Sequence, residues 1–307
     1  MAWQNTQQDF FKESTTPPLP CPITTGLNIA LKSVELLDVR CKSYNTKRYA
    51  KDDEIIESLF QSPDNYLTII ASHSTTANTN FSLSLINHFS LNCGSPVIYF
   101  SPAFDSEYFG IKLLSIASKL QLYKLHDGSL EKDEIEKMQQ TAGKIGEAPL
   151  FAGIVPNYSL HELKIDILEI IKNQKVKIII IDDFMLLEEL ADSDKRAYRK
   201  TLSTVLYDLH DFAKTNKTNI ILTMPLPAAK ENTSPELRDF SRYMLIPQIA
   251  DTVIFLHSEH QYTNENLTDA KIIVAKNTAS QPFSIPVQYN SFTGGFYYSH
   301  SFSSKLQ

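Results

Sequence analysis

The stretch LTIIASHSTTANTNFSLSL, residues Leu67–Leu85, decides how the rest of the chain is interpreted. Its first residues, Leu67–Ala71, are apolar and predict a buried β-strand. A polar loop is expected next, followed by a helix in which apolar residues recur among polar ones. A strand, a loop and a helix in this order form the setting of a phosphate-binding P-loop, and Thr79 stands at the position of its hydroxyl residue.

The loop lacks the residues with which a working P-loop binds phosphate. Such a loop needs glycines, which allow positive φ and close approach of the backbone, and a lysine that reaches the phosphates. Ala77, Asn78 and Thr79 stand in place of Gly-Lys-Thr, and no glycine occurs between Gly26 and Gly94. The sequence therefore predicts a nucleotide-binding fold whose nucleotide site has decayed.

Composition and length indicate a globular protein with one large domain, or with one domain plus appendages. Of its 307 residues, 42% are hydrophobic and 21% charged, which is ample for a core. A net charge of −6 argues against a strongly basic surface that binds nucleic acid non-specifically. The three cysteines, Cys21, Cys41 and Cys93, are far apart, which disfavours disulfides or a cysteine metal site and fits a reducing cytosol. Without a signal-peptide pattern or a membrane-spanning apolar run, a cytoplasmic location is expected.

Three segments are expected along the chain: a polar leader with a linker helix at residues 1–50, the main domain at 51–300 and a tail at 301–307. In the main domain, predicted strands alternate with amphipathic helices and are followed by a strand-rich end without helices. The stretch KIIIIDD, residues Lys177–Asp183, is apolar on both faces and predicts a central strand of a covered parallel sheet. The expected fold class is therefore α/β, with a mostly parallel central sheet flanked by helices and added antiparallel C-terminal strands.

Several segments occur in an order that is more informative than any one of them. This order resembles the C-terminal RecA-like motor domain of DnaB-type replicative helicases over roughly residues 52–298. The resemblance implies a RecA-like P-loop NTPase fold. The segments are DEIIESLFQSPDNYLTIIA (53–71), SPVIYFSPAF (95–104), AGKIGEAPLFAGIVPNYSLHEL (142–163), KIIIIDDFMLL (177–187), NIILTMPL (219–226), SPELRDF (234–240), IPQIADTVIFLH (246–257) and IIVAKNTASQPFSIPVQYN (272–290).

At most positions where the resemblance places catalytic residues, this sequence has a different residue type from the family pattern. The P-loop lysine is replaced by Asn78, whose amide can donate a hydrogen bond but cannot neutralise phosphate charge. Ala103 replaces the glutamate that would orient the attacking water, and Met224 or Pro225 replaces a glutamine at a strand end. Thr278 replaces the arginine that would reach a neighbouring subunit's nucleotide.

Three catalytic-type residues remain, namely Thr79, Asp182 and Lys276. By the resemblance, Thr79 and Asp182 would hold magnesium if nucleotide binds at the degenerate loop of Ala77, Asn78 and Thr79. Each also has a structural interpretation. Thr79 can begin a helix and satisfy its backbone donors, Asp182 can bond to loop amides at a strand end, and Lys276 can be a surface lysine.

Two hypotheses of different classes follow. Loss of phosphate neutralisation, nucleophile activation and the trans arginine is hard to reconcile with a motor, since each contributes orders of magnitude in rate. The first hypothesis is a catalytically inactive protein, without a required cofactor, that associates with itself or with a replicative helicase or another replication protein. The second is a divergent but active ATP-dependent DNA helicase or translocase. A weaker alternative is a sensor that binds nucleotide or another anion without hydrolysis.

DNA contact has limited support in the sequence, from a segment at residues 42–51 that interleaves basic residues with tyrosine. That composition suits nucleic-acid contact, although a solvated linker has the same composition. A dehydrogenase or a serine hydrolase is disfavoured, because neither a GxGxxG nor a GxSxG motif occurs.

Overall fold

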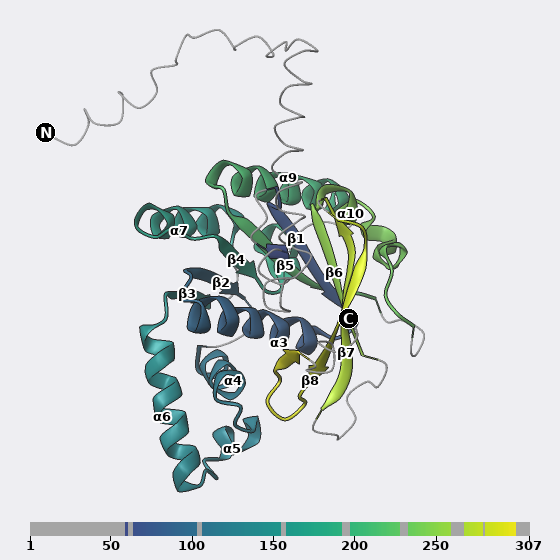
Figure 1. Cartoon of the computed structure of the whole chain (residues 1–307). Coiled ribbons are helices and arrows are strands. Elements are labelled where there is room, and N and C mark those ends of the chain that lie inside the picture. Colours follow the sequence, from purple (N-terminus) through teal and green to yellow (C-terminus); the bar gives the residue numbers. More distant parts are fainter. Residues whose placement is uncertain are drawn as a thin grey trace, which may run out of the picture. The chain divides into compact units, whose positions relative to one another are not determined.

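The computed structural model describes most of the chain between Leu59 and Tyr298 (Figure 1). The chain divides into two units, residues 1–50 and 51–307, and all described residues belong to the second. The predicted leader, linker helix and tail therefore lie outside the described residues. The described ranges are 59–60, 64–102, 106–154, 158–191, 197–227, 233–258, 267–278 and 280–298.

Within these residues, nine strands form one sheet in the order β3-β2-β4-β5-β1-β6-β7-β8-β9. The strands from β3 to β6 pair in parallel, whereas β6, β7, β8 and β9 pair antiparallel. This arrangement confirms the predicted α/β fold with added antiparallel C-terminal strands. The bounds are β1 Leu67–Ser72, β2 Val97–Ser101, β3 Leu150–Ile154, β4 Ile178–Ile181, β5 Asn219–Pro225, β6 Thr252–Ser258, β7 Thr268–Asn277, β8 Phe283–Tyr289 and β9 Phe296–Tyr298.

Helices cover both faces of the sheet (Figure 1). Apolar side chains of α7 and α9 join one buried cluster, and those of α3 and α4 join a second. None of the helices in the described part of the chain has the length and apolar character needed to cross a membrane. The bounds are α3 Thr75–Ile86, η1 Asn87–Asn92, α4 Ser106–Ser118, α5 Leu122–Asp127, α6 Lys132–Glu147, α7 Leu160–Asn173, η2 Phe184–Leu186, α8 Glu188–Ala191, α9 Tyr198–Asn216, η3 Leu237–Tyr243 and α10 Ile246–Ile249.

Strand β4 shows why a run of isoleucines forms the centre of this sheet. Ile179 and Ile181 belong to the cluster under α7 and α9, and Ile178 and Ile180 belong to the cluster under α3 and α4. Successive side chains of a strand point to opposite faces, so a strand covered on both faces needs apolar residues at every position. The central strand predicted from KIIIIDD is therefore confirmed.

The edge strand β3 was not predicted from the sequence. Its residues, LFAGI, form a short apolar run that is only partly buried or exposed, and a run this short cannot be assigned to a strand by periodicity alone. Gly153 lies close to the ring of Phe100 on β2, where an added Cβ would come within 2.5 Å of a ring carbon. Backbone pairing with β2 and the packing of Leu150, Phe151 and Ile154 against the apolar clusters hold this strand.

The carboxyl ends of β1, β2, β4 and β5 meet at one edge of the sheet because these strands run parallel. Ser72 lies opposite Pro225, and Ile181 lies opposite both Phe100 and Leu222. Ligand sites of open parallel sheets form beyond such strand ends. The candidate site is built at this edge.

Candidate functional site

The junction between β1 and α3 is much shorter than the predicted loop. Strand β1 ends at Ser72 and α3 begins at Thr75, so only His73 and Ser74 lie between them. The Ser74 hydroxyl is the N-cap and accepts the Ala77 N–H at 3.2 Å, and the Ser74 carbonyl accepts the Asn78 N–H at 3.2 Å. Ala77 and Asn78 therefore lie inside the helix, with their amides bonded to its first turn.

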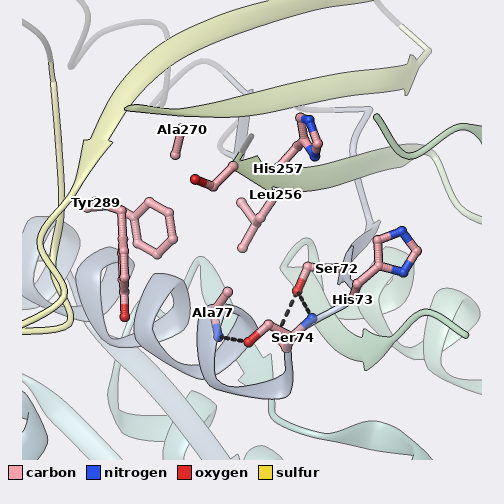
Figure 2. Close-up of a pocket in the computed structure, with 10 residues that line it drawn as sticks. Ser72, His73, Ser74, Ala77, Leu256, His257, Ala270 and Tyr289 are labelled. Atoms are coloured by element: carbon pink, nitrogen blue, oxygen red, sulfur yellow. Dashed lines mark hydrogen bonds between the residues drawn. The ribbon is translucent and has the colours of Figure 1, made fainter. Parts of the chain in front are cut away.

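Figure 2 shows how this turn is closed. The Ser72 hydroxyl donates to the Ser74 carbonyl at 2.6 Å and accepts the Ser74 N–H at 3.2 Å. His73 Nδ1 donates to the carbonyl of Pro227 at 2.7 Å, because a carbonyl can only accept. Backbone donors that a glycine-rich loop would offer to phosphate are thus used within the protein.

Asn78 points back toward the sheet. Its side chain is buried, with 2% of the residue exposed, and its Nδ2 donates to the carbonyl of Met224 at 2.7 Å. Met224 lies near the end of β5 with its side chain in the apolar core. Asn78, which the resemblance in sequence places at the position of the P-loop lysine, therefore joins α3 to β5.

The interpretation of Thr79 as a helix-start threonine is wrong. Ser74 caps α3, and Thr79 lies in the second turn. Serine is among the preferred N-cap residues, and the sequence between Ser74 and Thr79 contains neither glycine nor proline to delay the helix. The Thr79 hydroxyl instead hydrogen-bonds to Asp182.

Asp182 is the centre of a buried polar network directly after β4. The residue is 2% exposed, and its carboxylate accepts hydrogen bonds from the hydroxyls of Tyr99 at 2.9 Å and Thr223 at 2.5 Å. With Thr79, three hydroxyls from β2, β5 and α3 bind this acid. Burial raises the pKa of Asp182, and these hydrogen bonds lower it. Its partners are hydroxyls rather than the loop amides expected in the structural interpretation.

Lys112 was missed by sequence reasoning. It lies on α4 among the buried residues Phe109, Leu113 and Ile116, and it is 6% exposed. Its ammonium lies 5.3 Å from the ring centre of Tyr108. Burial lowers the pKa of Lys112 and the charge of Asp182 raises it. The available signal was a lysine in the i, i+3, i+4, i+7 pattern of the apolar face.

Lys112 and Asp182 line one cavity of about 290 Å³ at the end of the sheet. Asn78, Thr79, Asp183 and Thr223 also line it. The Asp183 side chain accepts the Met185 N–H at 2.9 Å and caps η2. Burial first, and the neighbouring charge of Asp182 next, raise the pKa of Asp183 to about 7.

A second, smaller cavity of about 90 Å³ lies on the other side of the β1–α3 junction (Figure 2). Ser72, Ala77, Leu256 and Tyr289 line it. The Tyr289 hydroxyl accepts a hydrogen bond from Asn80 Nδ2 at 2.9 Å. Helix α3 is therefore tied to β8 on this side, as it is tied to β5 through Asn78.

The other predicted site residues lie apart from Asp182. Lys276 on β7 donates to the carbonyls of Pro247 at 2.9 Å and Ala250 at 2.5 Å. Its ammonium thus provides a hydrogen-bond donor for carbonyls at the C-terminal end of α10. Burial lowers the pKa of Lys276. Thr278 is exposed and Ala103 lies outside the described residues. Across the described ranges, no cluster of three His, Cys, Asp or Glu side chains could hold a metal ion.

Comparisons with known proteins identify relatives of this chain. Residues 50–297 match the family described as "DnaB-like helicase C terminal domain". The replicative DNA helicase DnaB of Leifsonia xyli subsp. xyli is 22% identical over 282 residues, which cover 90% of this chain and 61% of the relative. That of Treponema pallidum (strain Nichols) is 23% identical over 228 residues, covering 74% and 50%. The chain thus spans between half and two thirds of the length of these relatives.

Two solved structures have the same fold. One, described as an ATPase domain, superposes with a TM-score of 0.74 at 17% identity, covering 91% of this chain and 100% of that one. The other, a DnaB-like replicative helicase described with its interactions with primase, superposes with a TM-score of 0.68 at 19% identity, covering 76% and 57%. These similarities confirm the RecA-like α/β fold that the segment order implied.

Proposed function

The chain belongs to the family of DnaB-like helicase C-terminal domains, and from this membership we propose that it is a RecA-fold protein that has lost ATP hydrolysis. Its proposed role is that of a binding or assembly module in DNA replication, in the cytoplasm. The observation that carries the proposal is that the protein itself occupies the groups that would hold phosphate. The amides of Ala77 and Asn78 bond to Ser74, and the Asn78 side chain bonds to Met224.

Magnesium-bound ATP does not fit this arrangement. Phosphoryl transfer depends on positioning and on neutralising charge that spreads over the transferred group. The position of the P-loop lysine holds a neutral amide with 2% of the residue exposed, and Thr278 is in place of the trans arginine. The Thr79 hydroxyl, which would ligate magnesium, bonds to Asp182. ATP and magnesium are therefore not proposed as cofactors.

The proposed partners are a second copy of this chain or a replicative helicase. Helix α7 exposes Ile165 at 50% and Leu168 at 40% of their surface, three residues apart and so on one side of the helix. Exposed apolar side chains that gather on one face are typical of protein–protein contacts. This face of α7 is the one we expect to contribute to assembly.

The experiment for catalysis is phosphate release from ATP by the purified full chain, with and without single-stranded DNA. We expect release no greater than that of the Asp182→Ala variant under the same conditions. Turnover that DNA stimulates and that Asp182→Ala abolishes would contradict the proposal. It would establish the alternative of a divergent ATP-dependent DNA helicase, which the presence of both Thr79 and Asp182 in the sequence favours.

The experiment for assembly is mass determination in solution, with the chain alone and mixed with a replicative helicase from the same cell. We expect a complex with one of the two, and its loss in an Ile165→Asp, Leu168→Asp variant. The matched control is Glu169→Gln on the same helix, which changes a polar residue without adding a charge to the apolar face. A strict monomer that does not bind the helicase contradicts the assembly role.

A further inference from the structure

We infer that the ammonium of Lys112 is the permanent counter-charge of Asp182, so that this site is complete without a divalent metal ion. The inference extends the proposed function and rests on it, since a working ATPase would need magnesium at Asp182. It concerns a residue that lies on α4, outside the P-loop and the strand-end motifs. The ligand that the site has replaced is a divalent cation of the magnesium class.

The Asp182 carboxylate has its own protein donors. Tyr99 donates to Oδ2 at 2.9 Å and Thr223 donates to Oδ1 at 2.5 Å, and the Thr79 hydroxyl also bonds to this acid. Magnesium requires near-ideal octahedral coordination by oxygen atoms that are free to bind it. In this network both carboxylate oxygens already accept hydrogen bonds from hydroxyls, so a metal ion would have to compete with these donors.

Hydroxyl donors satisfy hydrogen bonds but leave the negative charge of Asp182 uncompensated. A charged group that is buried needs an opposite charge nearby, because desolvation strongly disfavours an isolated ion. Lys112 meets this need, since it is 6% exposed and lines the same cavity as Asp182. The charge of each group also shifts the pKa of the other in the direction expected of opposite charges. The reverse also holds, because burial of a lysine on an apolar helix face requires an acid within reach.

The charges around the cavity favour an internal ion pair over an anion site. Lys112, Asp182 and Asp183 are the charged side chains that line it among the described residues. One cation facing two acids leaves no excess positive charge to attract a phosphate or a carboxylate. Asp183 accepts the Met185 N–H, so its own hydrogen bond holds it at η2.

A double-mutant cycle tests the pairing. The variants are Lys112→Met, Asp182→Asn and their combination, made in the full chain and unfolded with urea in the presence of EDTA. We expect each single variant to unfold more easily and the double variant to recover part of the loss. The expected coupling is at least about tenfold in the unfolding equilibrium constant, as found for residues in one buried network.

The matched control is the partly exposed pair of Lys164 on α7 with Asp208 on α9. Its Nζ and Oδ1 are 2.7 Å apart, with side chains 27% and 43% exposed. The cycle of Lys164→Met with Asp208→Asn should give a coupling of about twofold, because solvent screens such pairs. A Lys112 cycle no larger than this control overturns the inference.

A magnesium readout separates a counter-ion from a merely structural lysine. Thermal unfolding is followed without nucleotide, with MgCl₂ or with NaCl at the same ionic strength. Wild type and Lys112→Arg, which keeps the charge, should unfold at the same temperature in both salts, whereas Lys112→Met should be stabilised specifically by magnesium. Magnesium that stabilises wild type overturns the inference even if Lys112→Met does not fold. Because no ATP is present, this result is independent of the test for hydrolysis.

Discussion

The candidate site has a phosphate side, formed by Ser74, Ala77 and Asn78, and a magnesium side, formed by Thr79 and Asp182. On the phosphate side, certain groups would face a nucleotide. These groups instead form hydrogen bonds to α3 or β5. On the magnesium side, the two residues still meet. The amides on the phosphate side are thus bonded within the first helical turn, whereas Thr79 and Asp182 remain in contact across two elements. The carboxylate of Asp182 is the shared acceptor of hydroxyls from several elements.

The largest expected effect is on the magnesium side. Asp182→Ala should lower the free energy of unfolding by about 3–5 kcal/mol, because it leaves a buried cation and several hydroxyls without their acceptor. Urea unfolding measures this loss. The matched control is Asp211→Ala on α9, whose side chain is 82% exposed and whose loss should cost no more than about 0.5 kcal/mol. Equal effects of the two variants would mean that Asp182 is not the centre of the network.

The next effect addresses whether the phosphate side can be restored by one substitution. Asn78→Lys should lower the free energy of unfolding by about 2–3 kcal/mol, because it removes the donor to the Met224 carbonyl and buries a second cation near Lys112. It should not create ATP hydrolysis, since the amides of the first helical turn remain bonded to Ser74. Urea unfolding and phosphate release measure the two outcomes.

The control for this substitution is Asn173→Lys at the end of α7, where the side chain is exposed. It should change the free energy of unfolding by no more than about 0.5 kcal/mol. Recovery of ATP turnover in Asn78→Lys would show that only the cation had been lost from the phosphate side, and the contrast with the magnesium side would then disappear.

For both sides of the site, the sequence predicts the strands and helices better than the side-chain contacts between them. Strand β4, which Asp182 follows, is recognisable in the sequence because its isoleucines pack into two apolar clusters, one on each face of the sheet. At the start of α7, Ser159 and Glu162, three residues apart, form a capping box. These features depend on residues that are close in the sequence, and local patterns therefore identify them.

The features that sequence reasoning missed depend on distant partners. Asn78 bonds to Met224, and Lys276 bonds to carbonyls 26 and 29 residues away. Lys112 looks like an interruption of an apolar helix face until the fold brings Asp182 to the same cavity. The start of α3 was missed for another reason, because the family resemblance favoured a long loop over the cap that Ser74 provides.

The pH dependence of stability tests Asp183, the acid that follows Asp182 in the chain. Burial raises the pKa of Asp183 to about 7, above its ordinary value of 3.8, so the folded state binds more protons than the unfolded state between these values. Stability should therefore fall as pH rises from about 4 to 7. Asp183→Asn keeps an acceptor for the Met185 N–H and cannot ionise. It should be more stable than wild type by about 4 kcal/mol at pH 8 and nearly equal to it at pH 4.

Urea unfolding across this pH range, with wild type and Asp183→Asn side by side, measures that difference. Asp127→Asn serves as the control, because its side chain is 66% exposed and should show no such divergence. If wild type and Asp183→Asn keep a constant difference from pH 4 to 8, the burial of Asp183 has no electrostatic cost.

The smallest effect concerns the cap that closes the phosphate side. Ser74→Ala should lower the free energy of unfolding by about 1 kcal/mol, because the Ala77 N–H loses its acceptor. Ser74→Asp should retain this stability, since a carboxylate also caps a helix and suits its positive end. Hydrogen exchange of the Ala77 amide reports on the cap directly and should accelerate in Ser74→Ala alone. Unchanged exchange would mean that the first turn of α3 does not depend on Ser74, and the amides of the phosphate side would then be available to a ligand.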